Sequence, residues 1–371
     1  GSMINPDTSG LHGYDSGLFA PFQDNRYKPW LNVALGVSPG TPLVVPNASS
    51  LVSTISRPGD PTVFAPNGSM SQLQTAAVLT VLAVEPPEDA FRPPYVGADK
   101  TLRFRESDLH YGNLARVAPA GTPPSFAATA PKFQRVWLEH ISGWATRFMH
   151  PVDNMMDYGR DFTTEYGTGA LLAQLDVPDS TKRDLVVGLT QIGIDFHRNA
   201  QTASWPGEGG HGSGRKFPIL FAGAVLNDAS LLAIGQTHPS AYHGPSNPNN
   251  SSRFGEDCQT FYVQQTSPGV YNWGFGGYTS TLNNTAEWGF GHTNNIGADD
   301  SSWLGNSYRR CCTANAWVGQ TLCARMMGLV SAWNHPAYFD YQDRYMQTEL
   351  TSWRAWNPWH ETMWDAYRAT Y

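Results

Sequence analysis

The spacing of apolar residues predicts helices over most of this 371-residue chain. Two early candidates are SQLQTAAVLTVLAV, which ends at Val84 and has no internal Gly or Pro, and residues 131–149, whose apolar positions recur at roughly helical intervals. Further helices are expected over 164–176, 177–200, 217–228, 306–333 and in the tail from residue 334 to 371. The middle of the chain therefore reads as a series of helical hairpins.

Two segments lack this pattern. Residues 4–60 are rich in Pro, Gly, Asn and Ser, and predict irregular structure with one or two short strands. Residues 235–309 are dense in Gly, Asn, Thr and Ser, but their tryptophans argue against disorder.

Together the patterns predict a mainly α fold. We expect a single catalytic domain over 4–371 with an irregular N-terminal segment, 4–65. Helical hairpins joined by polar, aromatic loops suggest an (α/α) toroid, or barrel, in which long loops at one end form a cleft. An α/β fold is disfavoured because no series of buried parallel strands is visible.

The most informative stretch is WPGEGGHGSGRK, residues 205–216, which leads into the apolar helix FPILFAGAVLND. Pro218 falls in the first turn of that helix, where a missing N–H is tolerated. Glycines allow close backbone approach to a ligand, and here they surround His211, Arg215 and Lys216. We interpret the stretch as a site loop on a rigid helix. The alternative is a surface loop with a capping histidine.

Composition narrows the class of partner. With 24 basic and 31 acidic residues the net charge is −7, so no general basic field exists to hold nucleic acid. Aromatic residues reach 12% and charged residues only 15%, a balance that suits a secreted carbohydrate-active protein. No apolar run reaches the roughly 18 residues that a membrane span needs. Gly1-Ser2-Met3 looks like a cloning remnant and is left out of the interpretation.

The four cysteines leave two interpretations open. Their spacing does not match a zinc site. One or two disulfides would fit an oxidising compartment. Cys311 and Cys323 could equally be buried thiols on one helix, since they lie twelve residues apart.

Common catalytic motifs such as GxSxG, HExxH and the P-loop are absent from the sequence. The remaining candidates are histidines, tyrosines and arginines: His211, Tyr262, His292, Tyr308, Arg309 and Arg310. This set suits β-elimination on a uronic acid polymer, in which a cation neutralises the carboxylate, a base removes the C5 proton and a tyrosine protonates the leaving oxygen. Scattered carboxylates could instead supply a hydrolase pair: Glu208, Glu256, Asp257, Glu287, Asp299 and Asp300.

Several motifs together resemble an (α/α)-barrel polysaccharide lyase of family 38, whose members cleave glucuronan or mannuronate-rich alginate. They are FRPPYVGADK, YGRDFTTEYGTGALL, QIGIDF, GGHGSGRKFPILFAG, EDCQTFYV and YRRCC…MMGL…WNHPAYFDYQDRYM, between about Leu73 and Met346. The resemblance implies His211 as base, Tyr262 or Tyr308 as acid, and Arg215, Arg309 or Asn154 as the group that holds the uronate carboxylate.

We therefore expect a secreted, monomeric lyase acting on an anionic polysaccharide, without cofactor, metal, nucleic acid or membrane partner. Further substrate contacts are expected from Lys216, His292, Trp273 and Trp288. A glycoside hydrolase on the same barrel and a non-catalytic carbohydrate-binding protein remain the alternatives.

Overall fold

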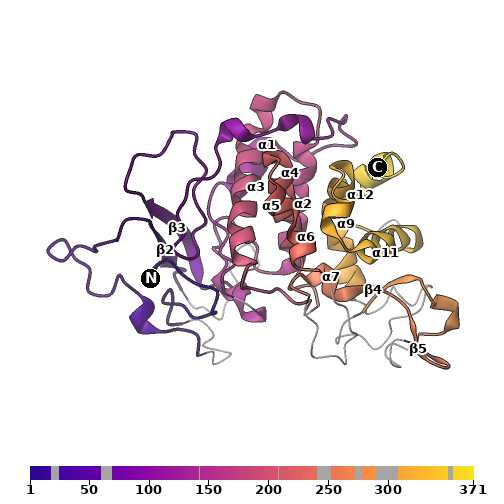
Figure 1. The fold of residues 1–371 in the computed structure, drawn as a ribbon, viewed down its shortest axis with the longest axis horizontal. Helices are drawn as coiled ribbons and strands as arrows, with labels where there is room; N and C mark the ends of the chain where they lie inside the picture. Colours follow the sequence, from indigo (N-terminus) through magenta and orange to yellow (C-terminus); the bar gives the residue numbers. More distant parts are fainter. Residues whose placement is uncertain are drawn as a thin grey trace.

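The computed structural model describes residues 1–17, 25–59, 69–141, 143–207, 209–239, 252–271, 278–289, 308–349 and 354–371. A small N-terminal sheet lies beside a larger helical body, and the C-terminal helices lie on the far side of that body (Figure 1). Helices account for 41% and strands for 12%, which confirms the mainly helical class.

The N-terminal layer is an antiparallel sheet in the order β1-β2-β3, formed by Ser2–Ile4, Ser49–Ser56 and Leu73–Val81. The helix expected up to Val84 is wrong, because its centre is strand β3, paired with β2 along nearly its whole length. Extended pairing satisfies the backbone of this stretch as well as a helix would, so tertiary contacts decide between them. The excluded tripeptide is part of the fold, since Ser2 pairs with Ser53 in β1.

A second small core fills the space between sheet and helices. Val52 and Leu73 of the sheet pack there with Leu138 and Phe148. The helix expected over 131–149 is therefore wrong: only two 3-10 turns form, Ala130–Phe133 and Trp144–Met149. Between them the chain places Leu138 in the sheet core, while its neighbour Trp137 belongs to the helical core. An extended segment points successive side chains to opposite sides, so it can bury apolar residues against both cores. An amphipathic helix would bury only one face.

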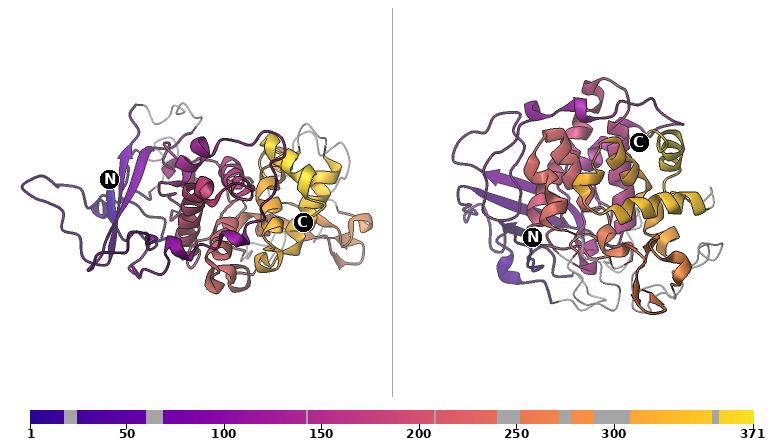
Figure 2. Two further views of the ribbon diagram at one scale, coloured as in Figure 1. Left: turned by 90° about the horizontal axis from the view of Figure 1, so that it is seen from above. Right: turned by 45° about the vertical axis from the view of Figure 1, so that its right-hand side comes forward.

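Two close helix pairs form the body (Figures 1 and 2). Helix α2 (Gly159–Ala173) packs on α9 (Ala314–Met326), and α3 (Asp179–Asn199) packs on α4 (Lys216–Leu226). A Cβ atom placed at Gly193 of α3 would lie 2.2 Å from the carbonyl oxygen of Pro218 in α4. Glycine is thus needed for this approach, and the predicted helices at 164–176, 177–200 and 217–228 are confirmed.

Shorter elements complete the chain. The helices are α1 Phe126–Thr129, α5 Ala229–Leu232, α6 Ile234–Thr237, α7 Gly255–Gln259, α8 Tyr308–Cys311, α10 Val330–Trp333, α11 Pro336–Thr348 and α12 Pro358–Tyr367. The strands are β4 Thr260–Tyr262, β5 Gln265–Ser267, β6 Val270–Tyr271 and β7 Ala286–Trp288, which pair as β4-β7 and β5-β6. The single helix expected over 306–333 is divided into α8, α9 and α10, and Gly328 with φ +67° ends its central part. No helix among the described residues combines the length and the apolar character of a membrane span.

Candidate functional site

Residues 209–215 of the glycine-rich loop run through the interior and not over the surface. A Cβ at Gly159, the first residue of α2, would lie 2.1 Å from the His211 carbonyl oxygen. One at Gly210 would lie 2.2 Å from the Cys312 carbonyl oxygen, and one at Gly212 would lie 1.8 Å from that of Pro206. The glycines therefore allow the loop to pass between the start of α2 and the start of α9, which fixes the position of His211.

His211 is held as a neutral base. Its side chain is buried, and Nε2 donates a hydrogen bond to the Gly143 carbonyl oxygen at 3.1 Å. A proton on Nε2 leaves Nδ1 with its lone pair, and Nδ1 has no hydrogen-bond partner among the described residues. Burial, helped by the charge of Arg215, lowers the pKa of His211 to about 3. The ring is thus unprotonated near neutral pH, with its lone pair on Nδ1, and it is a weak base for as long as it stays buried.

The side chain of Tyr158 lies near His211 and has two arginines close to its ring. Its ring lies 6.3 Å from that of His211 at an interplanar angle of 28°, and its hydroxyl accepts the Gly210 N–H at 3.2 Å. The guanidinium groups of Arg147 and Arg160 lie 5.4 and 5.5 Å from the centre of the Tyr158 ring. We call His211, Tyr158, Arg147 and Arg160 the His–Tyr–Arg cluster.

A cavity of about 370 Å³ lies at the start of α2, and Arg160 is the member of the cluster that lines it. Its lining residues are Ser69, Met156, Asp157, Arg160, Asp161, Thr164, Glu165 and Trp356. Arg160 stacks on the half-exposed ring of Trp356 at 3.7 Å and pairs with Asp161, while Arg147 pairs with Asp157 at 2.9 Å. Carboxylate, guanidinium and indole groups around one hollow are the chemistry that sugar recognition uses.

A residue that lines this cavity, Arg160, also contacts the cysteine pair. Arg160 donates a hydrogen bond to the carbonyl oxygen of Cys311 at 3.3 Å, and Cys311 forms a disulfide with its neighbour Cys312. The remaining cysteines, Cys258 and Cys323, are buried and form no disulfide with a described residue. Both interpretations of the cysteines are thus partly correct: one disulfide exists, and Cys323 is a buried thiol.

An ion cluster lies beneath His211. Arg215 donates to Glu139 Oε1 at 2.7 Å and to the carbonyl oxygen of His211 at 2.8 Å. His150 Nε2 lies 2.6 Å from the same carboxylate, and its Nδ1 lies 2.6 Å from the Met156 carbonyl oxygen. Burial alone would raise the pKa of Glu139, but Arg215 and His150 outweigh it and lower that pKa to about 2. Arg215 is fully buried, so in this structure it positions the loop and does not reach a substrate carboxylate.

Lys216 is likewise buried and paired with a carboxylate. Its Nζ donates to Asp257 and to the Trp333 carbonyl oxygen, both at 2.5 Å, and the Trp333 indole donates to Asp257 at 2.8 Å. Lys216 and Asp257 are both buried. The cations expected to hold the polyanion, Arg215, Lys216, Arg309 and Arg310, each lie next to a buried carboxylate instead, namely Glu139, Asp257, Glu287 and Glu349.

Glu256 is buried beside them. Its Oε1 accepts from the Gly214 N–H at 2.6 Å and from Gln320 at 2.7 Å, and burial raises its pKa. The carboxyl group thus ties the glycine-rich loop to α9, a structural task.

The other predicted site residues are spread over the molecule. Tyr262 donates its hydroxyl to Asp340 of α11 at 2.5 Å. Arg309 is buried 3.4 Å from Glu287, and the fully buried Trp288 belongs to the helical core. Asn154 is buried, with its amide directed at carbonyl oxygens of residues 132–136. No contact among described residues joins these side chains to His211.

Some predicted residues lie outside the described parts of the chain. These are Glu208, Trp273, His292, Asp299, Asp300 and the side chain of Tyr308. Within the described residues, no group of three or more His, Cys, Asp and Glu side chains is arranged to hold a metal ion.

Sequence reasoning missed Tyr158, Arg147, Arg160 and the buried Glu139. Tyr158 and Arg160 stand in DYGRD, where a tyrosine among four charged or glycine residues begins α2. That density of polar groups at a helix start was a usable signal. Glu139 and Arg147 lie within residues 131–149, the segment predicted as a helix. Because that prediction is wrong, it gave no indication of their contacts.

Comparison with known proteins gives no relative for this chain: no protein-family model matches it, and no curated protein or solved structure was matched.

Proposed function

We propose that this protein is a polysaccharide lyase that cleaves an anionic uronan by β-elimination at the His–Tyr–Arg cluster. The observation that carries the proposal is the meeting of a neutral histidine, a tyrosine hydroxyl and two partly exposed arginines, one of which, Arg160, lines a cavity. Each supplies one requirement of the reaction, which needs no cofactor.

The chemistry would run as follows. Arg160 or Arg147 holds the uronate carboxylate and makes the neighbouring C5 proton more acidic. Nδ1 of His211 takes that proton, and the C5–H electron pair becomes the C4–C5 double bond. The C4–O4 bond breaks, and the Tyr158 hydroxyl gives its proton to the leaving oxygen. Tyr158 thereby takes the role first assigned to Tyr262, while Tyr308 remains the second candidate.

Access to Nδ1 requires movement. His211 is 3% exposed, so a sugar can approach Nδ1 only when the residues that cover it shift. Closing and opening of active-site segments is common in enzymes that exclude water during reaction. The packed helix pairs support an (α/α) barrel as the frame of the site, and the disulfide supports secretion into an oxidising compartment. The expected monomer belongs to the same proposal.

A glycoside hydrolase is the second candidate. Three carboxylates line the same cavity, namely Asp157, Asp161 and Glu165, next to the half-exposed Trp356. Two carboxylates flanking a glycosidic bond are sufficient for hydrolysis. All three are paired with Arg or Lys, so either reaction requires these ion pairs to open for the substrate.

The deciding experiment compares polymers and products. Glucuronan, polymannuronate, polyguluronate, hyaluronan and pectate are incubated with the protein, and the ultraviolet absorbance of the unsaturated uronyl end is followed beside the number of new reducing ends. A lyase produces both signals, and a hydrolase only the second. A binding protein produces neither.

Variants then test the site on the best substrate. His211→Ala and Tyr158→Phe should each lower kcat by roughly 10²–10⁴-fold, the usual contribution of general acid–base catalysis. Tyr262→Phe is the matched control and should retain activity. Loss of activity in Tyr262→Phe alone would return the acid role to Tyr262, and full activity of His211→Ala would exclude His211 as the base. Circular dichroism verifies that each variant is folded.

A further inference from the structure

A second cavity, of about 400 Å³, lies away from the His–Tyr–Arg cluster. It is enclosed by the proline-held segment 91–104, the C-terminal end of α3 and the short helices α5 and α6. Its volume falls within the range of small-molecule sites. Neither the proposed reaction nor the ion clusters use it.

The walls of this cavity are pre-formed. Lys100 is buried and donates to the carbonyl oxygens of Pro94 and Gly97, both at 2.7 Å. Arg92 donates to the Pro93 carbonyl oxygen at 2.8 Å and pairs with the buried Asp195. Prolines fix the backbone between these anchors. A ligand therefore has little chain to order when it enters, which favours binding.

One part of the lining is apolar and another is cationic. Phe91, Ile194 and Leu231 are buried in the apolar part. Arg198 is exposed at the cationic part, and its guanidinium makes no hydrogen bond or ion pair with any described residue. A Cβ at Gly97 would lie 2.9 Å from Nη2 of Arg198, so the glycine leaves room for the guanidinium.

Two further ionisable groups at this cavity are either paired with a neighbour or uncharged at neutral pH. Arg103 lies 3.3 Å from Asp99, and both are about half exposed. Burial lowers the pKa of His197, against the attraction of Asp228, so this ring adds no charge at neutral pH. Among the described residues Arg198 thus makes no direct ion pair and is attracted by Asp99 of the same lining only at longer range, so its guanidinium can turn to a ligand.

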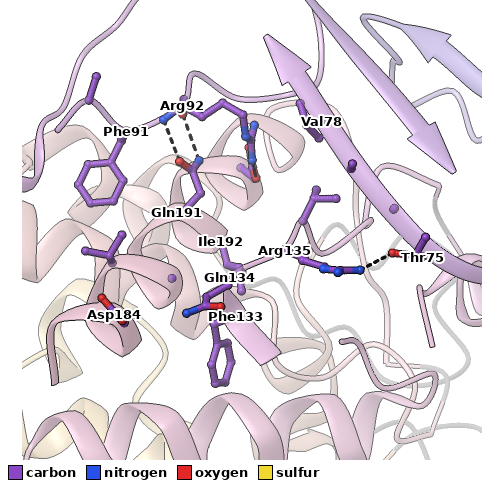
Figure 3. Close-up of a pocket in the computed structure, with 17 residues that line it drawn as sticks. Thr75, Val78, Phe91, Arg92, Phe133, Gln134, Arg135, Asp184, Gln191 and Ile192 are labelled. Carbon is purple, nitrogen blue, oxygen red and sulfur yellow. Dashed lines mark hydrogen bonds and ion pairs between the residues drawn. The ribbon is translucent and has the colours of Figure 1, made fainter. Parts of the chain in front are cut away.

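A wider hollow nearby offers a contrast. It has about 760 Å³ and lies between β3 and α3 (Figure 3). There Gln191 exchanges two hydrogen bonds with the backbone of Arg92, and Arg135 donates to Thr75 at 2.6 Å (Figure 3). Its labelled polar groups largely satisfy one another, whereas Arg198 in the smaller cavity is left for a ligand.

We propose that the smaller cavity binds an amphipathic monoanion, with a flat apolar body between Phe91 and Leu231 and a carboxylate or similar acidic group on Arg198. An aromatic or short aliphatic acid has this chemistry. The site is independent of the lyase proposal and stands if that proposal fails.

The test uses 2-naphthoate and its neutral analogue 2-naphthalenemethanol, with Kd measured by titration calorimetry on the full chain. Naphthoate should bind the wild-type protein with one-to-one stoichiometry and roughly tenfold or more tighter than the alcohol, since a hydrogen bond to a charged group contributes that much. Arg198→Ala should remove this preference, and Arg198→Lys should keep part of it. Thr237→Trp, at an exposed lining residue, should block both compounds.

Arg183→Ala is the matched control, because Arg183 is an exposed arginine of the same helix outside this cavity. Its affinity for naphthoate should equal that of the wild type. Equal binding of acid and alcohol, equal effects of Arg198→Ala and Arg183→Ala, unchanged binding in Thr237→Trp, or no binding to the wild type would each overturn the proposal.

Discussion

Two pairs of basic residues near His211 differ in burial, and we call Arg215 and Lys216 the lower pair and Arg147 and Arg160 the upper pair. Arg215 and Lys216 are fully buried and each contacts a buried carboxylate. Arg147 and Arg160 are 17% and 23% exposed; Arg160 lines a cavity, and Arg147 pairs with Asp157 of the same lining. The lower pair stabilises the loop, and the upper pair is placed to meet a ligand. Residue type near a candidate histidine therefore does not decide function, whereas burial and pairing do.

The largest effect should follow from breaking the lower cluster. Glu139→Gln leaves Arg215 buried without its counter-charge, and such a loss typically costs about 3–5 kcal/mol of unfolding free energy. Urea denaturation followed by circular dichroism measures it. Glu106→Gln is the control, because the Glu106–Arg183 pair is largely exposed and should contribute less than about 1 kcal/mol. Similar losses in both variants would contradict the role of burial.

The same cluster should make stability depend on pH. The folded-state pKa of Glu139 is about 2, below the ordinary value of 4.5. Its contribution is therefore fully present above about pH 4.5 and is lost as the pH falls towards 2, a change of about 3 kcal/mol. The difference in unfolding free energy between wild type and Glu139→Gln should shrink over this window. Glu256, whose raised pKa acts in the opposite direction, is present in both proteins and cancels in the difference.

The upper pair should behave in the reverse way. Arg160→Ala should lower kcat/KM on the best uronan roughly 10–100-fold, the value of a lost charged hydrogen bond, while unfolding free energy changes by less than about 1 kcal/mol. Arg116→Ala, at an exposed arginine paired with Asp179, is the control and should leave kinetics unchanged. A large stability loss without a kinetic change would place Arg160 with the lower, structural group.

The smallest effect is expected from the disulfide. Cys311 and Cys312 are adjacent, so their bond closes almost no loop in the unfolded chain. The loop-entropy model then gives about 1 kcal/mol, against about 3 for a 15-residue loop. Replacing both residues by serine and measuring urea denaturation tests this. A loss of several kcal/mol would show that local packing against Gly210 carries the stability.

The sequence predicted the helices well where apolar spacing was long and uninterrupted, as in α3 and α4. The sequence-based prediction was wrong for the segment that contributes side chains to both cores. Trp137 packs in the helical core and Leu138 in the sheet core, and the spacing of apolar residues does not reveal that one segment contacts two surfaces. The sequence singled out His211 from its glycines, and that histidine remains a candidate. It did not find Tyr158, because the contact between them spans 53 residues and depends on how α2 and the loop meet.

The glycines at 159, 210 and 212 also bear on how this protein can change by mutation. At each of them a Cβ would fall within 2.2 Å of a backbone oxygen, and backbone cannot move aside as a flexible side chain can. A library that randomises the loop would lose most members at these three positions before any selection for activity acts. Variation in substrate preference is therefore expected to accumulate at the cavity lining, around Trp356 and Glu165, whose contacts are made by side chains and not by backbone.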